Sequence, residues 1–159
     1  MTQTFKILAA VDLSDYSDTT VRYSLAIAKK MSADLILVNV INQRDLDIVR
    51  RAMVGYDSFS FDDYLEEQIK DRRMRMTALL ENAGRENIRC RFIVKDGIPY
   101  QKILETVTTE GADLLVVSTK GRSNLADVMV GSTASKLFRQ SPIPMVSIPA
   151  TYIHPSWLL

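Results

Sequence analysis

Gly131-Ser132-Thr133 is a segment whose residue types and spacing could hold a phosphate group, because it stands immediately before a predicted helix. A glycine at the start of a helix leaves the first backbone N–H groups accessible, and the helix dipole places partial positive charge there. The same residues could instead be a helix cap with a tight turn. The geometry expected from the sequence favours neither interpretation.

Asp12 is the second candidate, because it directly follows an apolar run that ends at Val11. A carboxylate at the end of a central strand can accept hydrogen bonds from a ribose hydroxyl or an adenine amino group. Aspartate is also among the residues that most often cap a helix, and a helix is predicted shortly after Asp12. The residues alone favour the cap.

Five short segments rich in β-branched residues must position these candidates, and each is predicted to be a strand. They span residues 7–11, 35–41, 88–94, 114–117 and 145–148. Four helical patterns alternate with them, and strands joined by helical crossovers require parallel neighbours. We therefore predict an α/β fold with an open, doubly wound, five-stranded parallel sheet and helices on both faces. In such a sheet, ligands bind beyond the carboxyl ends of the strands.

The remaining segments carry weaker patterns. Residues 42–60 lack a strong period, although residues 45–53 are weakly helical, and we predict a mobile flap or a variable insertion. The alternating residues around Cys90 predict an edge strand, with the cysteine in the core. We expect residues 1–149 to form one domain and residues 150–159 to form a C-terminal tail.

Composition argues against several classes of partner. The sequence has 20 Lys and Arg against 19 Asp and Glu, so a net charge of +1 provides no field to attract nucleic acid or an anionic membrane. Its apolar runs are too short for membrane insertion. Residues 1–20 contain three aspartates and do not resemble the apolar core of a signal peptide. The single cysteine can form no internal disulfide. We expect a cytoplasmic location.

Patterns of known catalytic sites are missing from the sequence. It contains no GxxxxGK[ST], GxSxG or HExxH motif, and its single histidine, His154, offers no base for a triad. We predict no catalytic residue and no metal site. Slow ATP hydrolysis needs only a positioned water, and Asp127 is a conceivable neighbour of Mg²⁺.

The glycine spacing resembles that of the universal stress protein family, and the resemblance extends over residues 5–149. The nucleotide-binding branch of that family carries Gly, two residues, Gly, nine residues, Gly and then Ser or Thr. Here Ser118 takes the first position, Gly121 the second, and Gly131-Ser132 follow after nine residues. Further segments that resemble the family are Ala10-Val11-Asp12, residues 37–41, Gly97-Ile98-Pro99 and residues 142–146.

The resemblance implies an adenine near Asp12 and Val40, with the ribose and phosphates over the glycine-bearing segments. We predict a Rossmann-like strand order of 3-2-1-4-5 and ATP, with or without Mg²⁺, as the ligand. We expect an extended Ser118, whose hydroxyl reaches the ribose or a phosphate, and a positive φ at Gly121. The predicted site residues are Asp12, Val40, Ser118, Gly121, Gly131, Ser132 and Thr133.

The leading functional hypothesis is an ATP-binding regulatory protein of the stress response that acts as a homodimer. The dimer would pair the last strand, Met145–Ile148, because this apolar edge carries no charged residue. One alternative is a nucleotide-free dimeric adaptor, which the serine at position 118 favours. A second alternative is a slow ATP hydrolase.

Overall fold

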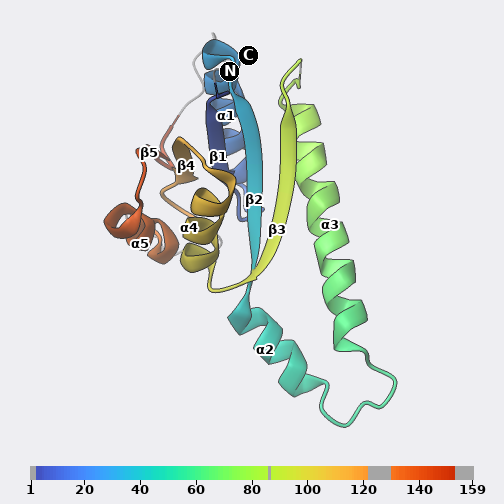
Figure 1. Ribbon diagram of the computed structural model, residues 1–159. Coiled ribbons are helices and arrows are strands. Elements are labelled where there is room, and N and C mark those ends of the chain that lie inside the picture. The colour runs from blue at the N-terminus through green and yellow to red at the C-terminus, as the bar shows by residue number, and fades with distance from the viewer. Residues whose placement is uncertain (1–2, 86, 122–129, 153–159) are drawn as a thin grey trace.

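The computed structural model describes residues 3–85, 87–121 and 130–152. These residues form one sheet of five strands with helices packed around it (Figure 1). The strands are β1 (Lys6–Ala10), β2 (Asp34–Asn42), β3 (Cys90–Gly97), β4 (Leu114–Ser118) and β5 (Met145–Ile148). The helices are α1 (Ser17–Met31), α2 (Gln43–Ala52), α3 (Phe61–Asn82), α4 (Pro99–Glu110) and α5 (Ser132–Gln140).

The sheet is entirely parallel and its strand order is β3-β2-β1-β4-β5, which confirms the predicted fold. From β1 the chain first adds β2 and β3 on one side, and later adds β4 and β5 on the other. The order therefore reverses between β1 and β4. At such a reversal the connections at the carboxyl ends diverge and leave a crevice.

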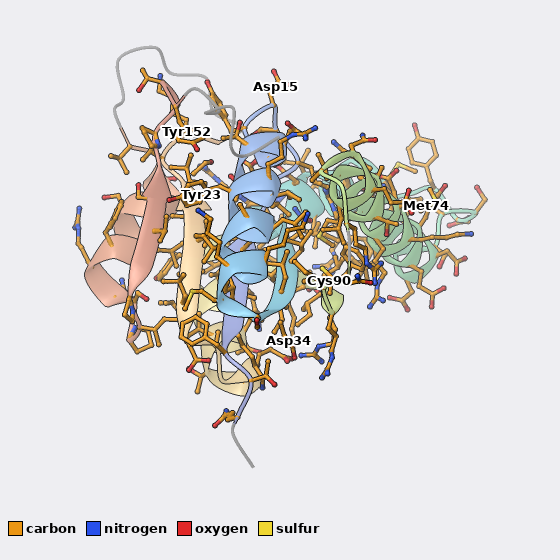
Figure 2. All side chains as sticks on the ribbon, turned by 90° about the horizontal axis from the view of Figure 1, so that it is seen from above. Asp15, Tyr23, Asp34, Met74, Cys90 and Tyr152 are labelled. Atoms are coloured by element: carbon orange, nitrogen blue, oxygen red, sulfur yellow. The ribbon has the colours of Figure 1, made fainter. Side chains whose placement is uncertain are left out.

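Helices cover both faces of the sheet, as predicted. On one face α1 and α3 pack on a core that includes Leu37, and Figure 2 shows these two helices on the same side. On the other face α4 and α5 pack on a second core that includes Val38. Alternation along each strand sends neighbouring residues to opposite cores. The largest fully buried side chains are Ile7, Leu8, Leu35, Ile36, Leu37, Ile41, Met76, Leu80, Leu115, Leu137, Val21 and Val38.

The segment predicted to be a flap or insertion contains a helix, α2. Asn42 caps this helix by accepting a hydrogen bond of 3.0 Å from the Arg44 backbone N–H, and Leu46 is its buried residue. The following α3 buries Met76 and Leu80, near its C-terminal end. Its first half projects beyond the sheet together with α2 (Figure 1). Residues 47–72 are called the arm below.

Several predicted boundaries shift. Strand β3 spans Cys90–Gly97 rather than 88–94, because its pairing with β2 continues to the end of that strand. It is an edge strand, as predicted. Burial raises the pKa of the Cys90 thiol to about 11, and the nearby positive charge of Arg85 opposes this increase.

Tyr152, in the segment predicted to be a tail, packs edge-on against Tyr23 (Figure 2). Within the described ranges, every helix is too short or too polar to cross a lipid bilayer.

Candidate functional site

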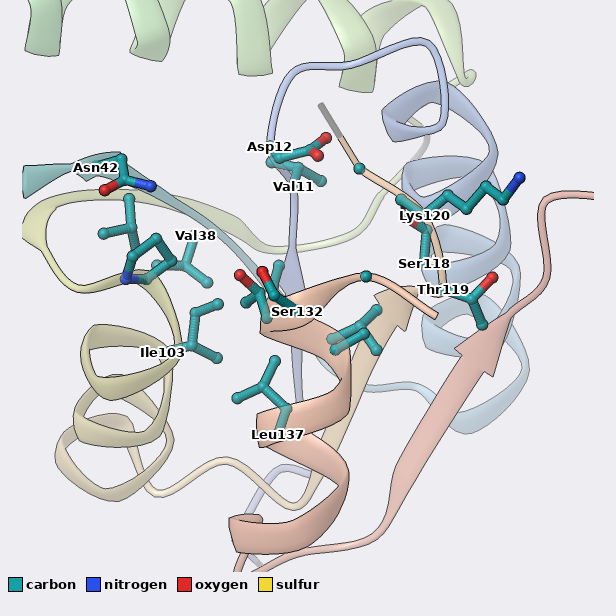
Figure 3. Close-up of a pocket in the computed structure, with 18 of the residues that line it drawn as sticks. Val11, Asp12, Val38, Asn42, Ile103, Ser118, Thr119, Lys120, Ser132 and Leu137 are labelled. Carbon is teal, nitrogen blue, oxygen red and sulfur yellow. Dashed lines mark hydrogen bonds between the residues drawn. The ribbon is translucent and has the colours of Figure 1, made fainter. Parts of the chain in front are cut away.

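A cavity of about 440 Å³ opens at the carboxyl ends of β1, β2 and β4 (Figure 3). Its volume lies within the range typical of small-molecule sites, roughly 300–1,000 Å³. The structure brings all the residues predicted from the sequence to this cavity, although they come from four separate segments. They are Asp12, Val40, Ser118, Gly121, Gly131, Ser132 and Thr133.

Asp12 lies just beyond the end of β1, in the turn that leads to α1. Its Oδ1 accepts hydrogen bonds from the Ser14 backbone N–H at 3.0 Å and from Ser17 Oγ at 3.2 Å. The N-cap residue of α1 is Tyr16, which makes no side-chain cap. The helix-cap interpretation of Asp12 is therefore wrong. One carboxylate oxygen stabilises the turn, and the other faces Gly121.

Gly121 is required for space rather than for a left-handed backbone. The prediction of a positive φ here is wrong, because the glycines with positive φ are all elsewhere in the described chain. A methyl group built on Gly121 would overlap Asp12 Oδ2. The glycine therefore allows the carboxylate of one loop to lie against the backbone of the other.

Ser118 ends β4 in an extended conformation, as predicted. Its hydroxyl donates a hydrogen bond to the backbone carbonyl of Lys120. The hydroxyl hydrogen is thus already engaged within the turn and is not available to a ribose or a phosphate. The hydroxyl oxygen can still accept a hydrogen bond from a ribose hydroxyl. The Lys120 side chain extends away from the cavity (Figure 3).

Thr119 follows β4 and is hydrogen-bonded both to the end of β5 and to the residue that precedes α5. Its N–H donates to the Ile148 carbonyl at 2.9 Å, and its carbonyl accepts the Gly131 N–H at 2.6 Å. A Cβ at Gly131 would stand 3.3 Å from that same carbonyl, so even alanine would require a small shift of the Thr119 backbone. Asp127 and His154 both lie outside the described residues.

The N-terminus of α5 supplies the groups suited to an anion. Gly131 is the N-cap residue, with an extended backbone and no side-chain cap. Its carbonyl accepts the first helical hydrogen bond, from Ser135 at 2.9 Å. The N–H groups of Ser132 and Thr133 thus have no helical acceptor, and both residues line the cavity. A phosphate would meet these amides and the positive end of the helix dipole.

The opposite side of the cavity is apolar and adjoins the end of β2. Val38 and Val40 contribute from the strand, Ile103 from α4 and Leu137 from α5 (Figure 3). The cavity therefore combines an apolar wall, suited to a planar ring, with an amide-rich wall suited to phosphates.

Sequence reasoning missed the contribution of α2. Arg44 and Asp45, in its first turn, also line the cavity. They were overlooked because residues 42–60 were expected to be a flap or an insertion. The available signal was Asn42, a preferred cap residue at the start of a weakly helical run.

Comparison with known proteins identifies the same fold. The Universal stress protein family profile matches residues 4–149. Universal stress protein YxiE of Bacillus subtilis is 26% identical over 146 residues, which cover 90% of this chain and 97% of YxiE. The solved structure of MJ0577, a protein of Methanocaldococcus jannaschii, superposes with a TM-score of 0.73 at 22% identity, covering 96% of this chain and 100% of that one.

Two further solved structures hold nucleotides. A universal stress protein in complex with cAMP has a TM-score of 0.57 at 22% identity, covering 94% of this chain and 100% of that chain. A universal stress protein from Archaeoglobus fulgidus in complex with dAMP has a TM-score of 0.60 at 13% identity, covering 93% and 99%. At these identities the structural likeness establishes a common fold.

Proposed function

We propose that this chain, which belongs to the universal stress protein family, binds an adenine nucleotide and acts as a cytoplasmic regulatory module. We propose ATP as the nucleotide. One observation carries the proposal: the free amides of α5, the Gly121 backbone and the Asp12 carboxylate surround a single cavity that also has an apolar wall. This combination matches a ligand with an aromatic base, a hydroxyl-bearing sugar and an anionic end.

In the proposed complex each part of the nucleotide meets a different wall. The adenine lies against Val40, and the ribose donates a hydroxyl hydrogen bond to Asp12. The phosphates lie over Gly131, Ser132 and Thr133, where backbone N–H groups donate to them. Because net charge is only +1, this local geometry has to hold the phosphates.

Relatives of the same fold support the choice of adenine. Two of the solved structures above are complexes with cAMP and dAMP, which share an adenine and differ in their sugar and phosphate. The proposal of a triphosphate goes further. It is supported by the row of amides at the start of α5, which can engage more than one phosphate oxygen.

Calorimetric titration with ATP, with and without Mg²⁺, tests this function. We expect saturable heat and a higher melting temperature, because a ligand that binds the folded state stabilises it. AMP, cAMP and GTP serve as comparisons: the first two test the phosphate contribution, and GTP tests the base. Neither heat nor a melting shift at saturating ATP would refute the proposal.

We also propose a homodimer that pairs β5 with its copy. This strand lies at one edge of the sheet (Figure 1), and its residues Met145, Val146 and Ser147 are half-buried in the single chain. Two-fold pairing would satisfy the unpaired backbone groups of both edges.

Light scattering at micromolar concentration tests the dimer. We expect twice the chain mass of 18.0 kDa for the wild type and the single-chain mass for Val146→Lys. Ile48→Lys, on the exposed arm, is the matched control and should remain dimeric. A monomeric wild type would contradict the proposal.

A further inference from the structure

The turn that carries Asp12 is held from the face of the sheet opposite the cavity. Along β2, Val38 and Val40 line the cavity, so alternation directs Asn39 to the side of α1 and α3. Asn39 is 2% exposed, and its side-chain amide donates a hydrogen bond of 2.8 Å to the Val11 carbonyl. The residue directly before Asp12 is thereby tied to the neighbouring strand.

Asn39 is unusual among its neighbours, because β2 otherwise buries apolar side chains. Burying an amide costs free energy unless it forms hydrogen bonds. Among the described residues its Oδ1 finds no donor, so the side chain is bonded through its amide N–H to the Val11 carbonyl. Packing alone therefore does not account for an asparagine at this position.

Arg75 provides a second contact, on the other side of Asp12. From α3, its Nη2 donates a hydrogen bond of 3.1 Å to the Leu13 carbonyl. Leu13 has a left-handed backbone with a φ of 62°. This conformation is unfavourable for residues other than glycine, and it persists where the surroundings hold it in place. The carbonyls before and after Asp12 each receive a donor from the same face.

We infer that Asn39 and Arg75 are positioning residues that fix the direction of the Asp12 carboxylate towards Gly121 and the cavity. Asn39 should contribute more, because it is buried, whereas the Arg75 side chain is 50% exposed and also faces Asp71. The effect on nucleotide affinity rests on the proposed function. The effect on the turn itself does not.

Amide hydrogen exchange tests the turn without any ligand. The Ser14 N–H donates to Asp12 Oδ1, so its protection reports the position of the carboxylate. We expect Asn39→Leu to reduce this protection roughly fivefold to tenfold, and Arg75→Met to reduce it by a smaller factor. Arg73→Met removes the same charge from the exposed side of α3 and should change nothing. Unchanged protection in Arg75→Met and in folded Asn39→Leu would overturn the inference.

A double-mutant cycle on ATP affinity tests the link to binding. If Asn39 acts through Asp12, Asn39→Leu weakens binding roughly tenfold in the wild type but less than about twofold in Asp12→Ala. Equal weakening in both backgrounds would indicate a merely structural role and contradict the inference. Failure of the wild type to bind ATP would refute the proposed function, and the Ser14 exchange would still decide whether the two residues hold the turn.

Discussion

The cavity and the arm both lie at the carboxyl edge of the sheet, yet they are built differently. Around the cavity, segments from separate parts of the chain are hydrogen-bonded to one another, as the Thr119 N–H is to the Ile148 carbonyl at 2.9 Å. The arm instead exposes large apolar side chains: Ile48 is 64% exposed, Val54 77% and Tyr56 63%. The comparison indicates that substitutions should be costly at the cavity and tolerated on the arm.

The arm has contacts of its own where α2 and α3 approach each other. The Arg50 guanidinium lies 4.2 Å from the centre of the Phe61 ring. The ring centres of Phe59 and Tyr64 are 6.0 Å apart. An exposed cation–π contact such as that of Arg50 with Phe61 contributes about 0.5–1 kcal/mol. The arm therefore depends on local contacts, whereas the cavity depends on the whole sheet.

Gly121→Ala would test the tight packing of the cavity most severely. Its methyl group would overlap the Asp12 carboxylate and displace it, so we expect ATP affinity to fall roughly a hundredfold or more. Calorimetry on the folded variant measures the effect. Gly131→Ala is the control, because its Cβ would meet Thr119 at 3.3 Å, and its loss should be smaller. Wild-type affinity in Gly121→Ala would show that the close approach is unimportant.

Two substitutions of Asp12 separate its role in the turn from its role towards the ligand. Asp12→Ala removes both, and we expect a loss of roughly 1–3 kcal/mol in ATP binding. Asp12→Asn keeps a carbonyl oxygen for Ser14 and Ser17 but removes the charge. An intermediate affinity is expected for it by titration. If Asp12→Ala bound ATP as well as the wild type, the carboxylate would serve the turn alone.

Ser118→Gly should have a modest effect on affinity. The serine is extended and its hydroxyl bonds within the turn, so we expect ATP affinity to change by less than about 1.4 kcal/mol, or tenfold. Parallel titration of both proteins measures this. Binding by Ser118→Gly together with no binding by the wild type would favour the nucleotide-free adaptor.

Substitutions on the arm should have the smallest effect. Replacing Val54 and Tyr56 by serine removes exposed apolar surface far from the buried core. We expect unchanged ATP affinity and a change in the free energy of unfolding within about 0.5 kcal/mol per site. Titration and denaturant unfolding provide the two measurements. A large loss of affinity would show that the arm and the cavity are coupled.

The fold followed from the sequence because its signals are local. Runs such as Leu35–Val38 identify strands, and Gly84, past the end of α3, marks a helix terminus. The boundaries of β3 were less accurate, since a strand ends where its partner ends. The helix α2 was predicted only as a weakly helical run at residues 45–53, because its stabilising features are a cap and one buried side chain, Leu46.

By itself, the sequence determined the alternation of strands and helices and the residues that would gather at the carboxyl edge. Only the tertiary structure decided how those residues meet. Gly121 is an example, since its need for glycine comes from the Asp12 carboxylate of another loop and not from its own backbone angles. Asn39 is a second, because its bond to Val11 joins neighbouring strands. Local patterns reflect interactions within a few residues, whereas the shape of a site depends on contacts between segments that are distant in sequence.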